Sequence, residues 1–132
     1  MAHPQMFDDG DPILARVRKI ALALPRAQEK TSHGRPFFYT KSGFAVYGGG
    51  PKDKHKDVEN WRQTLLFSPD PSEATALSQD ERFFVPAYYG PGGWLGLRLG
   101  DGDVDWDEVR ELITDSWRQF VPPTVAREYE RG

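Results

Sequence analysis

The residues whose types and spacing could do chemistry are mainly basic ones in the first half of the chain. Between Arg26 and Arg62 the sequence holds eight cations and four acids, a local charge of +4, although the whole chain has a net charge of −3. Lysine and arginine side chains contact the phosphates of nucleic acids. We expect backbone contacts from five basic residues at predicted turns and loops, which are Arg35, Lys41, Lys52, Lys54 and Lys56.

Two interpretations of these basic residues stay open. In the first, two basic loops project from one sheet and grip a nucleic-acid backbone like paired wings, and an exposed Tyr39, Tyr47 or Trp61 stacks on a base. In the second, the aromatic residues form the core and the lysines keep an exposed hairpin from associating with other chains. The acidic balance of the whole chain also disfavours generic binding of polyanions.

No pattern of nucleophile, acid–base pair or metal ligands stands out. His3, His33 and His55 lie far apart and follow no zinc-binding spacing. The absence of cysteine excludes disulfides and thiolate chemistry and suits a reducing compartment. No apolar run approaches the roughly 20 residues of a membrane span. We therefore expect a cytoplasmic protein that is not an enzyme and that uses no metal, cofactor or membrane.

The aromatic stretch 83–95 is a second candidate surface. It places four aromatic residues before a Gly/Pro turn and a tryptophan after it. Tyr88, Tyr89 and Trp94 would form part of an apolar patch or a face for self-association if their rings are exposed. Otherwise they have a packing role, with Trp94 anchoring the next strand on the core. A small-ligand pocket between the sheet and this turn is a third alternative, although the sequence names no convergent polar groups for it.

Helix and strand patterns predict a two-layer α+β domain. Asp11-Pro12 is a cap followed by proline, after which apolar residues recur at helical spacing. Asp70-Pro71 repeats this pattern before a short helix, and Asp105 is expected to cap the last main helix. Aromatic and apolar runs between Gly-containing turns predict strands, in the order α-β-β-β-(β)-α-β-β-α. We expect an antiparallel sheet with the helices mainly on one face.

The whole chain, residues 1–132, is expected to form a single domain. Residues 1–10 are predicted to be a flexible N-terminus. Residues 122–132 are predicted to be a C-terminal tail with a short helix at most, because Pro122-Pro123 ends the preceding helix.

A series of short motifs covers the chain from Asp11 to about Val121. They are Leu24-Pro25, His33-Gly34-Arg35-Pro36-Phe37-Phe38, Gly43-Phe44-Ala45, Val85-Pro86-Ala87-Tyr88-Tyr89-Gly90, Gly93-Trp94-Leu95, Asp105-Trp106-Asp107-Glu108-Val109 and Asp115-Ser116-Trp117-Arg118. In order and spacing they resemble the MmcQ/YjbR-like family of small bacterial proteins. The resemblance implies a two-layer α-β-β-β-α-β-β-α fold like that of secretion chaperones. It also implies double-wing DNA binding, which rests on fold analogy.

This chain departs from the family pattern in two ways. Ser116-Trp117 stands where the family commonly has Ser-Tyr, and the net charge is acidic. The sequence therefore predicts a non-enzymatic protein that binds DNA through two basic loops. The alternative is a protein–protein or chaperone-like module that binds a protein partner or a second copy and no nucleic acid.

Overall fold

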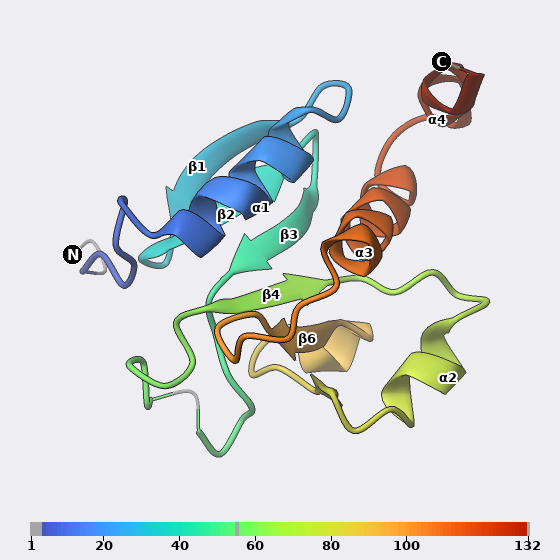
Figure 1. Ribbon diagram of the computed structural model, residues 1–132. Helices are drawn as coiled ribbons and strands as arrows, with labels where there is room; N and C mark the ends of the chain where they lie inside the picture. Colours follow the sequence, from blue (N-terminus) through green and yellow to red (C-terminus); the bar gives the residue numbers. More distant parts are fainter. Residues whose placement is uncertain (1–3, 55, 132) are drawn as a thin grey trace.

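The computed structural model describes residues 4–54 and 56–131, which form a helical layer on an antiparallel sheet (Figure 1). This confirms the predicted α+β class. The elements are α1 (Pro12–Leu22), β1 (Gln28–Ser32), β2 (Arg35–Tyr39), β3 (Gly43–Tyr47), β4 (Thr64–Phe67), α2 (Ala74–Ser78), β5 (Phe83–Phe84), a 3-10 turn η1 (Gly90–Gly92), β6 (Leu95–Arg98), α3 (Trp106–Arg118) and α4 (Pro123–Arg131).

The sheet has six strands in the order β1-β2-β3-β4-β6-β5, and all neighbouring pairs are antiparallel. His33 and Gly34 join β1 to β2 with positive φ angles of 52° and 83°, as a tight hairpin turn requires. Residues 40–42 join β2 to β3 at the opposite end of β2. The loop that follows Tyr47 therefore leaves β3 at the end away from residues 40–42.

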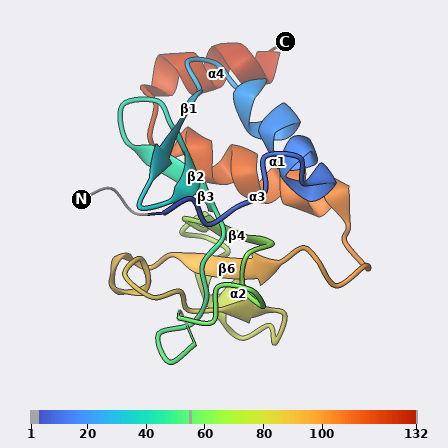
Figure 2. The same ribbon diagram turned by 90° about the vertical axis from the view of Figure 1, so that its left-hand side faces the viewer.

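The helices α1 and α3 lie next to each other along one face of the sheet, in contact with β3 (Figures 1 and 2). Both begin at the predicted caps. The Asp11 carboxylate accepts a hydrogen bond from the Ile13 amide at 2.9 Å, and the Asp105 carboxylate accepts from the Asp107 amide at 3.0 Å. These caps set the start of each helix and thereby the direction of its apolar stripe.

The core fills the space between these helices and one face of the sheet. Leu65 and Phe67 of β4 belong to the main cluster of buried side chains, together with Leu14 of α1. Successive strand residues point to opposite faces. Val46 and Leu66 are buried but lie outside that cluster, because they point to the outer face, away from α1 and α3.

Two consecutive residues fasten α3 to the rest of the domain. Ser116 donates a hydrogen bond to the Phe44 carbonyl at 2.6 Å and accepts one from the Ser68 amide at 2.9 Å. Trp117 is fully buried, and its Nε1 donates to the Pro25 carbonyl at 2.9 Å. Ser116-Trp117, part of one motif of the family resemblance, therefore joins α3 to β3, to the residue after β4 and to the segment after α1.

Three local expectations differ from the structure. The helix predicted after Asp70 begins only at Ala74, because the Asp70 carboxylate accepts from the amide and hydroxyl of Ser72 and forms a turn. The alternation of Trp61, Gln63, Leu65 and Phe67 predicts a strand over 61–67 with one face in the core. In the structure the strand begins at Thr64, and its residues are buried on both faces. The C-terminal segment forms α4, which extends for nine residues and packs Tyr129 against Trp117 with ring centroids 5.2 Å apart.

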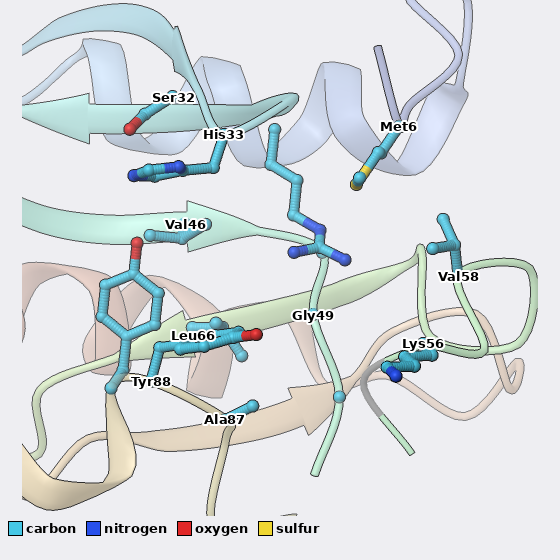
Figure 3. A pocket seen from close by; sticks show the side chains of 14 residues that line it. Met6, Ser32, His33, Val46, Gly49, Lys56, Val58, Leu66, Ala87 and Tyr88 are labelled. Atoms are coloured by element: carbon cyan, nitrogen blue, oxygen red, sulfur yellow. The ribbon is translucent and has the colours of Figure 1, made fainter. Parts of the chain in front are cut away.

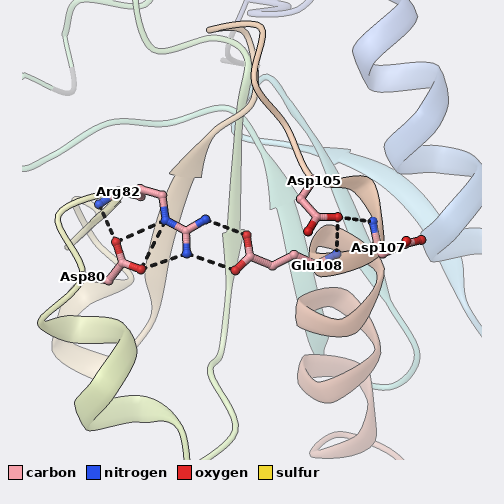
Figure 4. A network of polar contacts seen from close by, with 5 residues as sticks. All are labelled: Asp80, Arg82, Asp105, Asp107 and Glu108. Atoms are coloured by element: carbon pink, nitrogen blue, oxygen red, sulfur yellow. Dashed lines mark hydrogen bonds and ion pairs between the residues drawn. The ribbon is translucent and has the colours of Figure 1, made fainter.

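A charged network holds the chain before β5 against the start of α3 (Figure 4). Arg82 pairs with Asp80 at 2.8 Å and with Glu108 at 2.8 Å. Acidic residues near a helix N-terminus are stabilised by the positive end of the helix dipole. Asp107 and Glu108 lie in the first turn of α3, where they face this positive end.

Candidate functional site

The outer face of the sheet is crossed by the segment that follows β3. The Gly48 amide donates to the Thr64 carbonyl at 2.8 Å, and the Gly49 amide donates to the Trp61 carbonyl at 2.9 Å. Gly49 has a φ of 123°, and a Cβ at this position would lie 3.1 Å from the Leu66 side chain. Glycine is needed here because the backbone lies directly on the outer side of β4.

The crossing segment and the turn at 86–89 enclose a cavity of about 600 Å³ on this outer face (Figure 3). The Ala87 amide donates to the Gly50 carbonyl at 2.9 Å, which joins the two segments. Val46 and Leu66 form an apolar floor, and the β1–β2 turn and Lys56 contribute to the walls. A mainly apolar cavity of this size with a few polar groups is typical of a small-molecule site.

Arg35 is the most unusual polar group of the cavity. Burial lowers the pKa of Arg35, and the phenols of Tyr89 and Tyr88 act in the opposite direction. The buried Nε lies against Gly48 and finds no hydrogen-bond acceptor within the described chain. Over the same described residues, the cavity lining contains cations but no carboxylate. Arg35 is thus a partly desolvated cation that faces the cavity without a carboxylate beside it.

Tyr88 and Tyr89 form another wall of the cavity. The Tyr89 amide donates to the Ala87 carbonyl at 2.8 Å across Tyr88, whose φ is 69°. This is a γ-turn with a positive central φ, which is rare and strained. Tyr89 is half-buried and packs on Trp94 with ring centroids 5.1 Å apart. Burial raises the pKa of Tyr89, although Arg35 opposes the shift, and the phenol stays neutral at physiological pH.

The structure separates the basic residues predicted to act together. Arg35 and Lys56 line the cavity, and Lys52 and Lys54 are exposed on the same loop as Lys56. Lys41 lies at the other end of β3, in the turn before Gly43. Five residues of strand place these two ends at least about 13 Å apart. Lys41 and the 52–56 loop therefore lie at opposite ends of β3, and only the 52–56 loop lies beside the cavity.

The three aromatic residues of the expected partner surface also differ in their exposure. Tyr88 is 79% exposed, whereas Tyr89 and Trp94 are half-buried. Trp94 packs between Tyr89 and Phe120, with its ring 6.4 Å from that of Phe120, and is not part of the main core cluster. Tyr47 is buried in the core, so this ring is not placed to stack on a base. Of the three residues of the expected partner surface, Tyr88 is the exposed one, and Val85, which had no predicted role, is 60% exposed three residues before it.

Several cavity residues had no predicted site role. Ser32 and His33 line it from the β1–β2 turn and Met6 lines it from the N-terminal segment, where the Met6 amide donates to the Gly34 carbonyl at 2.8 Å. The other two histidines, His3 and His55, lie outside the described residues. The run of three glycines at 48–50 is the indication that the sequence offers, since glycine accompanies close backbone approaches, although by itself such a run predicts only a turn.

None of the helices in the described part of the chain is both long and apolar enough to cross a membrane. The comparisons with known proteins give one match. The model of the YjbR family matches residues 22–119, a range that includes Arg35, the 52–56 loop and the turn with Tyr88 and Tyr89. No curated protein and no solved structure matches the chain.

Proposed function

The chain belongs to the YjbR family, and on this premise we propose that it is a binding protein, not an enzyme, whose cavity takes a small organic anion. The observation that carries the proposal is the position of Arg35 at the cavity. A partly buried cation costs free energy unless an opposite charge or hydrogen-bond acceptors compensate it. A carboxylate or phosphate oxygen supplies both, and guanidinium groups bind these planar or tetrahedral anions in two-point fashion.

The composition of the cavity supports the same ligand class. The chain as a whole is acidic, yet the charged side chains among the described cavity residues, Arg35 and Lys56, are both basic. Apolar side chains at the floor favour an organic body over a bare inorganic ion. The hydroxyl groups of Ser32, Tyr88 and Tyr89 are further hydrogen-bonding groups within the lining.

Arg35→Gln is expected to weaken binding of a carboxylate probe at least about tenfold, because a hydrogen bond to a charged group is worth about 1.5–3 kcal/mol. The measurement is an NMR titration of the full chain with hexanoate, with 1-hexanol as the uncharged counterpart. Hexanoate should shift the amide signals of residues 46–50 and 87–89 at lower concentrations than hexanol does.

Two variants control this experiment. Lys54→Gln removes a cation from the neighbouring loop but not from the cavity lining, and should leave the affinity nearly unchanged. Arg35→Lys keeps the charge and should retain part of the affinity, which separates loss of the anion contact from loss of the fold. Equal affinities for hexanoate and hexanol, or an unchanged affinity in Arg35→Gln, would contradict the proposal.

DNA binding is a second candidate, favoured by the exposure of Lys52, Lys54 and Lys56 on one loop beside the cavity. Replacing all three with glutamine should then abolish binding of duplex DNA in a fluorescence titration at low salt. In the unaltered chain, each neutralised phosphate contributes about −0.9 to the slope of log K against log salt. Lys41→Gln is the matched control at the far end of β3. Absence of binding at tens of micromolar protein would remove this candidate.

A further inference from the structure

Tyr88 is the second unusual feature of the cavity. Tyr88 is the central residue of the strained γ-turn, with a φ of 69° that side-chain-bearing residues rarely adopt. Tyr88 is 79% exposed, so burial of its side chain does little to offset this strain. Backbone strain at exposed residues is common at ligand sites, where it serves to place a side chain.

The surrounding hydrogen bonds hold the strained turn in place. The Gly90 amide donates to the Pro86 carbonyl at 2.9 Å, and the Ala87 amide donates to the Gly50 carbonyl at 2.9 Å. The turn is thus tied at both sides of Tyr88, and its backbone cannot relax without breaking these bonds. In Figure 3 the Tyr88 ring rises from the turn toward Val46 and His33, with Leu66 beside it. The ring consequently forms one flat side of the cavity mouth.

From this arrangement we infer that the ligand carries a planar aromatic body that stacks on Tyr88, with its oxyanion directed to Arg35. The inference rests on the proposed function, because it specifies the organic part of the anion that Arg35 binds. Aromatic rings prefer offset-stacked or edge-to-face contacts with one another, and such pairs add to the effect of burial alone. The floor formed by Val46 and Leu66 accepts the edge of such a body without requiring hydrogen bonds.

Two classes of ligand that combine a flat ring with an oxyanion fit the cavity of about 600 Å³. One is an aromatic carboxylate, and the other is a nucleoside monophosphate, whose base and phosphate are joined by a short linker. Arg35 binds the oxyanion of either, and Tyr88 stacks on the ring of either. The shared requirement is a flat ring system at one end and a carboxylate or phosphate at the other.

The test compares three anions by NMR titration of the full chain, which are 2-naphthoate, AMP and hexanoate. At least one of the two aromatic anions should bind about three- to tenfold more tightly than hexanoate, as expected for one aromatic pair. The tighter of the two identifies the source. Tyr88→Ala should lower the affinity for the aromatic anions more than the affinity for hexanoate and so remove this preference, and Tyr88→Phe should retain it.

Tyr88→Gly separates a binding role of Tyr88 from a structural one, because the two roles predict different changes in the melting temperature. Glycine adopts positive φ without strain, so this variant should have a melting temperature equal to or above that of the unaltered chain, although it loses the preference for aromatic anions. Equal affinities for hexanoate and both aromatic anions would overturn the inference and leave the proposed function standing. If none of the three anions binds, both are overturned.

Discussion

Replacing Trp117 with alanine is expected to lower the free energy of unfolding by about 3–5 kcal/mol, the usual cost of deleting a large buried aromatic side chain. Trp117 is fully buried on α3, and its indole Nε1 donates to the Pro25 carbonyl at 2.9 Å. Alanine would leave a cavity that the surrounding core fills only in part. It would also leave the Pro25 carbonyl without its donor and Tyr129 without its ring partner.

Urea denaturation followed by circular dichroism measures this change, with the m-value as a check that unfolding stays two-state. Trp117→Tyr is the informative control, because the family resemblance places tyrosine at this position. The smaller ring keeps most of the aromatic contact with Tyr129, and we expect a loss of less than half that of Trp117→Ala. A loss below about 1 kcal/mol in Trp117→Ala would show that α3 is held mainly by other contacts.

The part of the fold that local patterns determine could be predicted from the sequence. Asp11 and Asp105 cap the two main helices because their side chains bond to amides only two residues away. Leu95 and Leu97 alternate with outer-face residues and are buried in the core, as their period of two predicts. Gly96 of the same strand lies against the Phe84 ring of β5, which a Cβ at this position would overlap.

The cavity could not be predicted in the same way, because it depends on contacts between distant segments. Arg35, the glycines at 48–50 and Tyr88 come together only through the crossing segment, which long-range hydrogen bonds to Trp61 and Thr64 hold. A strand pattern that alternates predicts one exposed face, and this is why β4 was expected to be half-exposed. In the structure, the backbone of Gly49 covers Leu66. A glycine contributes no apolar side chain, so a cover of this kind leaves no apolar pattern in the sequence.

The grouping of the basic residues also depends on how distant segments are arranged in space. Charge along the sequence indicates how many cations lie in a region but not at which end of a strand they lie. Lys41 and Lys56 are close in the sequence, yet β3 separates them. Arg35, which precedes both, lies at the Lys56 end because β2 is antiparallel to β3. Strand direction therefore decides which cations share a site.

A buried polar cluster around Asp11 joins α1 to the sheet and leads to the second large prediction. The Asp11 side chain accepts hydrogen bonds from the Ile13 amide at 2.9 Å, the Tyr47 hydroxyl at 2.6 Å and the Gln63 side-chain amide at 3.2 Å. The residue is only 6% exposed. Asp11→Ala removes a helix cap, worth about 0.5–2 kcal/mol. It also leaves the buried Tyr47 hydroxyl without its acceptor, at a cost of about 1–3 kcal/mol.

We therefore expect Asp11→Ala to lower the free energy of unfolding by about 1.5–5 kcal/mol at neutral pH, from the summed cap and desolvation costs. Tyr47→Phe, the matched variant, removes the donor and keeps the ring and the cap, so its loss should be about 1 kcal/mol. Burial raises the pKa of Tyr47, and its hydroxyl thus stays protonated as a donor throughout the neutral range.

The effect of Asp11 should depend on pH in a defined direction. Burial alone would raise the pKa of the Asp11 carboxyl, but hydrogen bonds from Tyr47, Ile13 and Gln63 outweigh it and hold the pKa below the usual value of 3.8. A carboxyl with a lowered pKa in the folded state stabilises the fold above its unfolded pKa, and this contribution is lost as the pH falls through the folded value. The stability difference between the unaltered chain and Asp11→Asn should therefore be constant from pH 7 to about pH 5 and shrink below about pH 4. Urea titrations across this range measure the stability difference. If this difference grew on acidification, Asp11 would be protonated more readily in the folded state than in the unfolded chain, contrary to the prediction.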